Sequence, residues 1–192
     1  EEFANLTCAT HVDWLSAQKI KHAPGKTHEY NNSNYVLLAR VVEEASGLSF
    51  SRFVTKHIFE PLRMAQAVAF ERLDQKVPHR AVGYAKKGKR LAATEQPTLA
   101  MGDGNLFLSI QDMAKWDLAL RNQTLLGQKW LDEAWTNGHL DSGKAIKDED
   151  GYGYGYGFQL AEGDDFNTAF HSGSWAGTST SIIRYLTEDL TV

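Results

Sequence analysis

The sequence predicts an α+β fold, a helical domain followed by part of an antiparallel sheet. Three observations favour it. Apolar residues recur with helical spacing up to about residue 137 of the 192 residues. After about residue 150 the sequence alternates and becomes rich in β-branched residues. Helices first and strands last is an α+β order. We therefore expect residues 1–150 to form a mostly helical domain and residues 151–192 to form inner strands of a sheet.

The first two helices have recognisable start and stop signals. Thr10 and Asp13 match a capping box for a first helix, and Pro24-Gly25 is the stop signal that follows it. An apolar stripe predicts a second helix, and Gly47 stands where a left-handed C-terminal residue is wanted. This stripe consists of Leu37, Leu38, Val41, Val42 and Ala45.

Further helices and one hairpin complete the first part. Ser49 begins a third helix, and Ser109 caps another, with Asp112 as its expected box partner. A last helix is predicted over about residues 128–137. Between them the chain is irregular, with a short hairpin expected around Gly88.

The end of the chain predicts strands. The Gly-Tyr run at 151–157 alternates as a strand does, and residues 178–192 are rich in β-branched side chains around a turn at Thr187-Glu188-Asp189. Two or three strands without further partners make a poor sheet. We therefore expect the chain to be a piece of a larger domain, or its sheet edge to be covered by a partner.

Composition argues against several classes. The net charge of −4 and the isolated cluster at 86–90 favour a solvated hairpin tip over a nucleic-acid surface. No apolar run reaches the roughly 18 residues of a membrane span. The seven histidines include no H-E-x-x-H, so no metal site is expected. Cys8 is the only cysteine, which excludes an intrachain disulfide, and a Cys8–His11 site has no other support.

Tyr30 and Asn32 stand directly before the second helix and allow two interpretations. In the structural one, Ser33 or Asn32 caps the helix and Tyr30 is a half-buried aromatic. In the functional one, the Tyr30 phenol shuttles a proton, while the Asn32 amide binds a substrate carbonyl or holds a neighbouring lysine.

His171-Ser172-Gly173 opens a predicted strand and is also open to two interpretations. It could be a turn followed by an edge strand. Alternatively, Gly173 lets a ligand approach the backbone, and the free edge binds an acyl substrate and offers an N–H to an oxyanion. By contrast, Gly102-Asp103-Gly104 is a poor phosphate loop, because it lacks Gly-Lys-Ser/Thr and a preceding strand.

Taken together, these stretches resemble the penicillin-recognising serine hydrolases, which include class C β-lactamases, D-alanyl-D-alanine carboxypeptidases, D-aminopeptidases and related esterases. "HAPGKTHEYNNSNYVLLARVVEEASGLSFSRFVTKHIFEPLRM" resembles the family's Pro-Gly, Tyr-x-Asn, helix and "PLGM" run, with Arg63 in place of the usual glycine. "GDGNLFLSIQDMAKWDLAL" resembles its glycine turn and helix, and "YGYGYGFQL" and "HSGSWAG" resemble its late strands. The order and spacing of these motifs carry the resemblance.

The resemblance implies a β-lactamase/transpeptidase-like fold and roles for individual residues. Tyr30 would be the proton-relay phenol and Asn32 a substrate-binding amide. His171, in the family's Lys/His-Thr/Ser-Gly motif with Ser172 and Gly173, would bring positive charge, and the backbone N–H of Ser174 would serve the oxyanion hole. We expect Tyr30, Asn32 and His171 to line one cleft, with residues 102–104 on its wall.

The family's nucleophile is the serine of Ser-x-x-Lys, well upstream of Tyr-x-Asn. The string Ser16-Ala17-Gln18-Lys19 is interpreted as a chance match, because it lies in a segment that resembles the family's non-catalytic approach to Pro-Gly. We expect the nucleophile before Glu1 and the remaining strands before Glu1 and after Val192.

By resemblance, the reaction would be acylation of the serine by an amide or ester, followed by hydrolysis, with no metal or organic cofactor. The partner would be a small-molecule or peptide acyl substrate, and the location periplasmic or extracellular. One alternative is a binding protein that kept the cleft and lost the chemistry. Another is a plain helical interaction domain.

Overall fold

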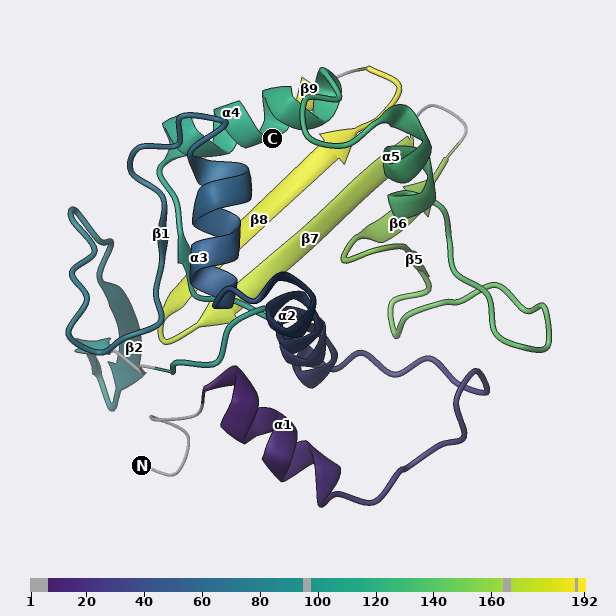
Figure 1. Ribbon diagram of the computed structural model, residues 1–192, viewed down its shortest axis with the longest axis horizontal. Helices are drawn as coiled ribbons and strands as arrows, with labels where there is room; N and C mark the ends of the chain where they lie inside the picture. Colours follow the sequence, from purple (N-terminus) through teal and green to yellow (C-terminus); the bar gives the residue numbers. More distant parts are fainter. Residues whose placement is uncertain (1–6, 95–97, 164–166, 189) are drawn as a thin grey trace. The chain divides into compact units, whose positions relative to one another are not determined.

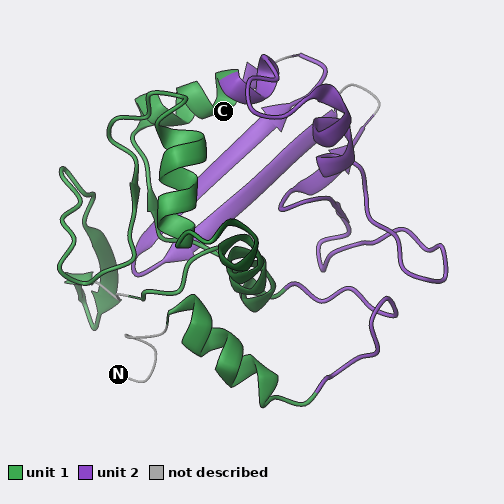
Figure 2. Cartoon of the chain, viewed as in Figure 1, with its two compact units in different colours: residues 1–19, 31–118 green, residues 20–30, 119–192 purple. Residues whose placement is uncertain are grey.

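The computed structural model describes residues 7–94, 98–163, 167–188 and 190–192 (Figure 1). The chain divides into two compact units, coloured separately in Figure 2. The first takes residues 1–19 and 31–118, and the second takes residues 20–30 and 119–192. Helices and antiparallel strands are both present, which confirms the α+β class. The division of the chain at about residue 150 stays a prediction.

The first unit is mainly helical, with two small two-stranded sheets, β1 with β4 and β2 with β3. Gly88 turns the β2–β3 hairpin with a φ of 63°, as the sequence predicts. Helix α4 begins in this unit and ends in the second. The elements are α1 (Cys8–Ser16), α2 (Asn32–Ser46), α3 (Phe50–Val54), the π-helical turn η1 (Thr55–Phe59), β1 (Val68–Ala69), β2 (Gly83–Lys87), β3 (Arg90–Thr94), β4 (Leu106–Phe107) and α4 (Ile110–Arg121).

Helix α1 begins earlier and ends sooner than predicted. Its N-cap is Thr7, whose hydroxyl accepts from the Thr10 N–H at 3.2 Å, while the Thr10 hydroxyl accepts from the Thr7 N–H at 2.9 Å. The predicted box of Thr10 with Asp13 is therefore wrong. The helix ends at Ser16, and Ile20 is 83% exposed, so no apolar contact extends the helix toward Pro24.

The ends of α2 and α3 agree better with the sequence. Gly47 adopts a φ of 68° at the C-terminal end of α2, and Ser49 caps α3. At the start of α2, however, the cap is Asn31, whose side-chain oxygen accepts from the Ser33 N–H at 2.9 Å. The predicted caps, Ser33 and Asn32, instead lie in the first helical turn.

One apolar core holds the first unit together. It gathers α1, α2, α3 and η1 around the segments at 64–69 and 100–101. Burying a side chain the size of Val36, Phe59 or Met64 contributes roughly 1.5–3 kcal/mol. The buried members are Cys8, Val36, Ala39, Val54, Phe59, Met64, Ala69, Ala100 and Met101.

Asp112 is a buried acid at the start of α4, with 1% of its surface exposed. Ser109 caps the helix as predicted, because its hydroxyl accepts from the Asp112 N–H at 3.2 Å. The Asp112 carboxylate has other partners than the Ser109 N–H that a capping box would give it. It accepts from the Gln66 N–H at 2.8 Å and from Lys115 Nζ at 2.7 Å. Burial pushes the pKa of Asp112 up, but the bonds from Lys115 and Gln66 outweigh burial and lower its pKa from the ordinary value.

We expect Asp112→Ala to destabilise the full-length protein by about 1–3 kcal/mol at pH 7, because the Gln66 N–H loses its acceptor and Lys115 loses its carboxylate partner. Since the folded pKa is depressed, the stabilisation is present above the unfolded carboxyl pKa. It is lost as the pH falls through the lower, folded pKa. Urea unfolding from pH 7 to pH 2 measures it. Asp13→Ala, at an exposed position, is the control, and equal losses in both variants would contradict the assignment.

The second unit is built on a five-stranded antiparallel sheet in the order β5-β6-β7-β8-β9. This is more than the two or three strands expected, although both edge strands are short. The long strands β7 and β8 lie side by side in Figure 1. A turn at residues 186–188 leads toward β9, as predicted, while Asp189 lies outside the described residues. The elements are α5 (Gln128–Ala134), β5 (Gly153–Tyr154), β6 (Gln159–Glu162), β7 (Asn167–Trp175), β8 (Thr178–Tyr185) and β9 (Leu190–Thr191).

Candidate active site

The candidate site centres on the second half of β7. The prediction that His171-Ser172-Gly173 opens the strand is wrong. The three residues lie in the middle of β7. Strand β6 pairs with β7 only as far as Phe170. In the part of the chain that the structure describes, residues 171–175 pair with β8 alone. Among those residues, no strand pairs with 171–174 on the side away from β8, which is where an extended ligand could add as a further strand.

The hairpin register decides which backbone groups face that edge. Ala176 and Gly177 join β7 to β8 with φ values of 44° and 76°, the left-handed pair of a two-residue hairpin. Such a turn closes on a hydrogen-bonded pair, here Trp175 with Thr178. Because pairs alternate along an antiparallel ladder, Ser172 and Ser174 direct their N–H and C=O groups away from β8. The Ser174 N–H thus points toward the unpaired edge.

Two hydrogen bonds fix the imidazole of His171. Its Nδ1 lies 2.6 Å from the Ser172 carbonyl oxygen, and its Nε2 lies 3.2 Å from the Tyr154 hydroxyl. A carbonyl oxygen can only accept, so Nδ1 carries a proton. In the neutral ring Nε2 is then the acceptor, and the Tyr154 O–H donates to it. Protonation of His171 would reverse this second bond, so that Nε2–H donates to the phenol oxygen.

The ring of Tyr30 packs near the rings of His171 and Tyr154. Its ring centroid is 5.9 Å from that of His171 and 6.1 Å from that of Tyr154. His28 adds a further ring, 5.3 Å from Tyr154. Tyr30 is 51% exposed, so these rings cover only part of it. The structure therefore brings together Tyr30 and His171, which the sequence predicted as parts of one site.

Tyr154 and His28 were missed by the sequence reasoning. The Gly-Tyr run was interpreted only as strand alternation, which does not distinguish Tyr154 from Tyr152 and Tyr156. Their fates differ. Tyr152 packs on Phe170, Tyr154 bonds His171, and the Tyr156 hydroxyl donates to Glu133 at 2.8 Å. For His28 the sequence gives no signal beyond its nearness to Tyr30.

Asn32 and the glycine turn belong to the first unit. Asn32 is the first residue of α2, and Gly102 lies against Tyr35 and Ala39 of the same helix. Asn32 is exposed in the first turn of the helix. Gly102 has a φ of 112°, and any Cβ on it would collide with the Tyr35 carbonyl and with Ala39. Only glycine therefore lets this turn lie against α2. Burial raises the pKa of the neighbouring Asp103 carboxyl. That Asn32 and residues 102–104 share a cleft with Tyr30 and His171 stays a prediction.

The other polar pairs of the first unit are structural. Cys8 Sγ is held between the N–H and C=O of Met101, and burial raises the pKa of its thiol. His11 Nε2 lies 3.1 Å from the Ser33 hydroxyl, the hydrogen-bond distance that a catalytic serine and its histidine base also need. However, the buried Nδ1 of His11 has no hydrogen-bond partner, so no third group orients the ring as a catalytic base requires. The contact is best understood as joining α1 to α2.

Ser16 and Lys19 do not form a nucleophile and base. Ser16 is the last residue of α1, and its hydroxyl donates to the Asp13 carbonyl at 2.7 Å. Lys19 lies beyond the helix, so the two side chains do not face each other across a helical turn. This geometry supports the interpretation of the string as a chance match.

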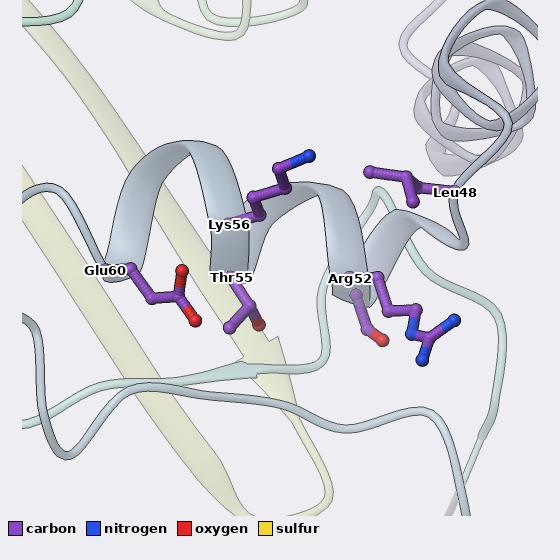
Figure 3. Close-up of a pocket in the computed structure, with 6 residues that line it drawn as sticks. Leu48, Arg52, Thr55, Lys56 and Glu60 are labelled. Atoms are coloured by element: carbon purple, nitrogen blue, oxygen red, sulfur yellow. The ribbon is translucent and has the colours of Figure 1, made fainter.

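A shallow hollow on the first unit contains none of the predicted site residues. It lies along α3 and η1, where Figure 3 shows Arg52 and Lys56 one helical turn apart. The hollow is open to solvent and pairs no nucleophile with a base. The site at Tyr30 and His171 stays a prediction. The hollow is lined by Leu48, Ser51, Arg52, Thr55, Lys56 and Glu60.

Within the described ranges, no group of three or more His, Cys, Asp or Glu side chains is placed to hold a metal ion. Every helix in those ranges is too short or too polar to cross a bilayer.

Comparison with known proteins points to one family. A family model described as Beta-lactamase matches residues 1–192. Penicillin-binding protein 4* of Bacillus subtilis (strain 168) is 28% identical over 176 residues, which cover 85% of this chain and 38% of that protein. PbpX of the same strain is 35% identical over 126 residues, covering 65% of this chain and 32% of that protein.

A solved structure agrees with these matches. The penicillin-binding protein homologue from Pyrococcus abyssi superposes with a TM-score of 0.82 at 25% identity, covering 96% of this chain and 42% of that one. The fold is therefore β-lactamase/transpeptidase-like, as the resemblance predicted. The chain spans less than half of each of these three relatives.

Proposed function

This chain belongs to the Beta-lactamase family, the penicillin-recognising serine hydrolases, and from that premise we propose that it carries part of a serine-hydrolase site. The reaction is hydrolysis of an amide or ester through an acyl-enzyme. One observation carries the proposal. Tyr30 lies against His171, which belongs to the part of β7, residues 171–174, that pairs with β8 and with no other described strand. Two motifs from opposite ends of the chain thus meet beside a strand edge that can receive an acyl group.

The nucleophilic serine and its lysine lie outside these 192 residues in this proposal. The serine oxygen attacks the substrate carbonyl carbon, a C–O bond forms, and the carbonyl oxygen becomes an oxyanion. The Ser174 N–H donates to that oxygen, because the register directs it to the unpaired edge. The Tyr30 phenol relays the serine proton to the leaving amine or alcohol, the carbonyl re-forms, and the C–N or C–O bond to that group breaks. Water then attacks the acyl-enzyme and releases the acid.

Asn32 and His171 bind the substrate. Asn32 offers an amide from the exposed first turn of α2. His171 is locked by Ser172 and Tyr154, so it presents a fixed ring rather than a mobile base. When protonated it adds positive charge beside the acyl group, which suits a substrate that carries a carboxylate.

A mass measurement on the full-length protein tests the proposal. After incubation with a fluorophosphonate or an activated ester, one adduct is expected on a serine outside the 192 residues. Peptide mapping locates it, and Ser16→Ala should form the same adduct. An adduct on Ser16 would contradict the proposed position of the nucleophile. No adduct at all would contradict the proposed hydrolase and favour the alternative, a binding protein that retains the cleft.

A further inference from the structure

The segment that delivers Tyr30 lies in an unexpected unit. Residues Ile20–Tyr30, called the strap below, group with the sheet of the second unit, although α1 and α2 on either side belong to the first. The strap contains no helix or strand. Whatever holds it therefore sets where the Tyr30 phenol lies.

The strap is held first at its Pro-Gly turn. The Lys26 N–H donates to the Ala23 carbonyl at 3.3 Å, with Pro24 and Gly25 between them. Gly25 has a φ of 74°, as the third residue of a type II turn requires. Its carbonyl accepts from the Asp141 N–H at 2.9 Å. Lys26 Nζ is 3.3 Å from the Asp141 carboxylate, but both side chains are more than half exposed, so this ion pair contributes little.

A side chain at Gly25 would require the Asp141 carboxylate, the end of a side chain that is 59% exposed, to turn away. A Cβ on Gly25 would fall inside the Asp141 carboxylate group, against its carbon and both oxygens. The positive φ excludes most other residues independently. The Pro-Gly pair, predicted as a helix stop, therefore has another use, because α1 ends well before it.

The strap is held again at its far end, by the rings of His28 and Tyr30 on Tyr154. Hydrogen bonds connect the two attachments. The backbone of Tyr154 bonds the Asn137 side chain at 2.9 Å and the Gly138 N–H at 3.0 Å. Asn137 also donates to the Ile146 carbonyl at 3.0 Å, across the base of the loop that carries Asp141. The loop that contacts Gly25 through Asp141 is therefore linked to Tyr154 by hydrogen bonds.

We propose that Gly25 and Asp141 form a seat that holds the strap and so positions Tyr30 against His171. They are positioning residues, since they act on the site through Tyr30. The inference rests on the proposed function only for its effect on rate. The docking of the strap itself can be measured without any substrate.

The test compares two alanine variants of the full-length protein. Gly25→Ala meets both the strained φ and the Asp141 carboxylate. Gly143→Ala, in the same loop as Asp141, has a similar φ of 80° with nothing within 4 Å, so it has the strain without the collision. Gly25→Ala should raise the rate of tryptic cleavage after Lys21 and Lys26 several-fold and lower kcat by about 10–100-fold, since a misplaced catalytic group costs that much. Gly143→Ala should change neither by more than about twofold.

A double variant keeps the test falsifiable if Gly25→Ala folds poorly. Gly25→Ala with Asp141→Gly removes the carboxylate and should return both readouts toward those of Gly143→Ala. Equal cleavage of Gly25→Ala and Gly143→Ala, or a double variant no better than the single one, would overturn the seat. Faster cleavage with an unchanged kcat would support the seat and refute the proposed catalytic part of Tyr30, so the two failures are distinguishable.

Discussion

Replacing Tyr30 by Phe in the full-length protein is expected to lower kcat by about 10²–10⁴-fold, the usual contribution of a positioned proton relay. The change removes one hydroxyl and leaves the ring against His171 and Tyr154. Because Tyr30 is 51% exposed, the stability loss should stay below about 1 kcal/mol. The measurement is kcat on an activated ester, with a thermal melt of the same sample.

The matched control for this substitution is Tyr84→Phe. Tyr84 is 55% exposed, on the β2–β3 hairpin, and belongs to none of the predicted motifs. Its variant should keep the wild-type kcat. If Tyr30→Phe also stays within about twofold, a barrier change under ~0.5 kcal/mol, Tyr30 is an ordinary packed aromatic.

Ser174→Pro should lower kcat by about 10²–10³-fold, which is the usual loss when one oxyanion donor is removed. Proline has no N–H, and the register directs the Ser174 N–H away from β8. The ladder between β7 and β8 therefore keeps its bonds, and the protein should remain folded, as proline on an edge permits. Kinetics on an activated ester, together with circular dichroism, measure both expectations.

Two companion variants separate the backbone from the side chain. Ser174→Ala keeps the N–H, so most of the rate should remain. Gly173→Pro removes an N–H that faces β8 and should destabilise the hairpin itself. If Ser174→Ala lost as much rate as Ser174→Pro, the hydroxyl and not the backbone N–H would be the functional group.

Local signals predicted local structure well. Gly47, Gly88 and Ser109 each act where the sequence placed them, because a left-handed glycine or a capping hydroxyl needs only its neighbours. The failures involve competition or distance. Thr7, and not Thr10, is the N-cap of α1. The Asp112 carboxylate accepts a hydrogen bond from Gln66, 46 residues away in sequence. No pattern within one helix encodes that second contact.

The candidate site shows the same limit. Tyr30 and His171 were found because their motifs could be matched one by one. Tyr154 was not, because its part depends on the rotation that brings its hydroxyl to His171 Nε2. The attachment of the strap to the second unit was also hidden. It depends on the fit of Gly25 against Asp141, a contact between segments more than a hundred residues apart in sequence.

A crystal structure of the full-length protein with a trapped acyl or boronate adduct would test the central claim most directly. The account predicts that the adduct lies along residues 171–175 of β7, on the edge opposite β8. Its former carbonyl oxygen should lie about 2.7–3.1 Å from the Ser174 nitrogen, with the Tyr30 hydroxyl beside the serine oxygen. An adduct out of hydrogen-bond reach of both groups would contradict the account.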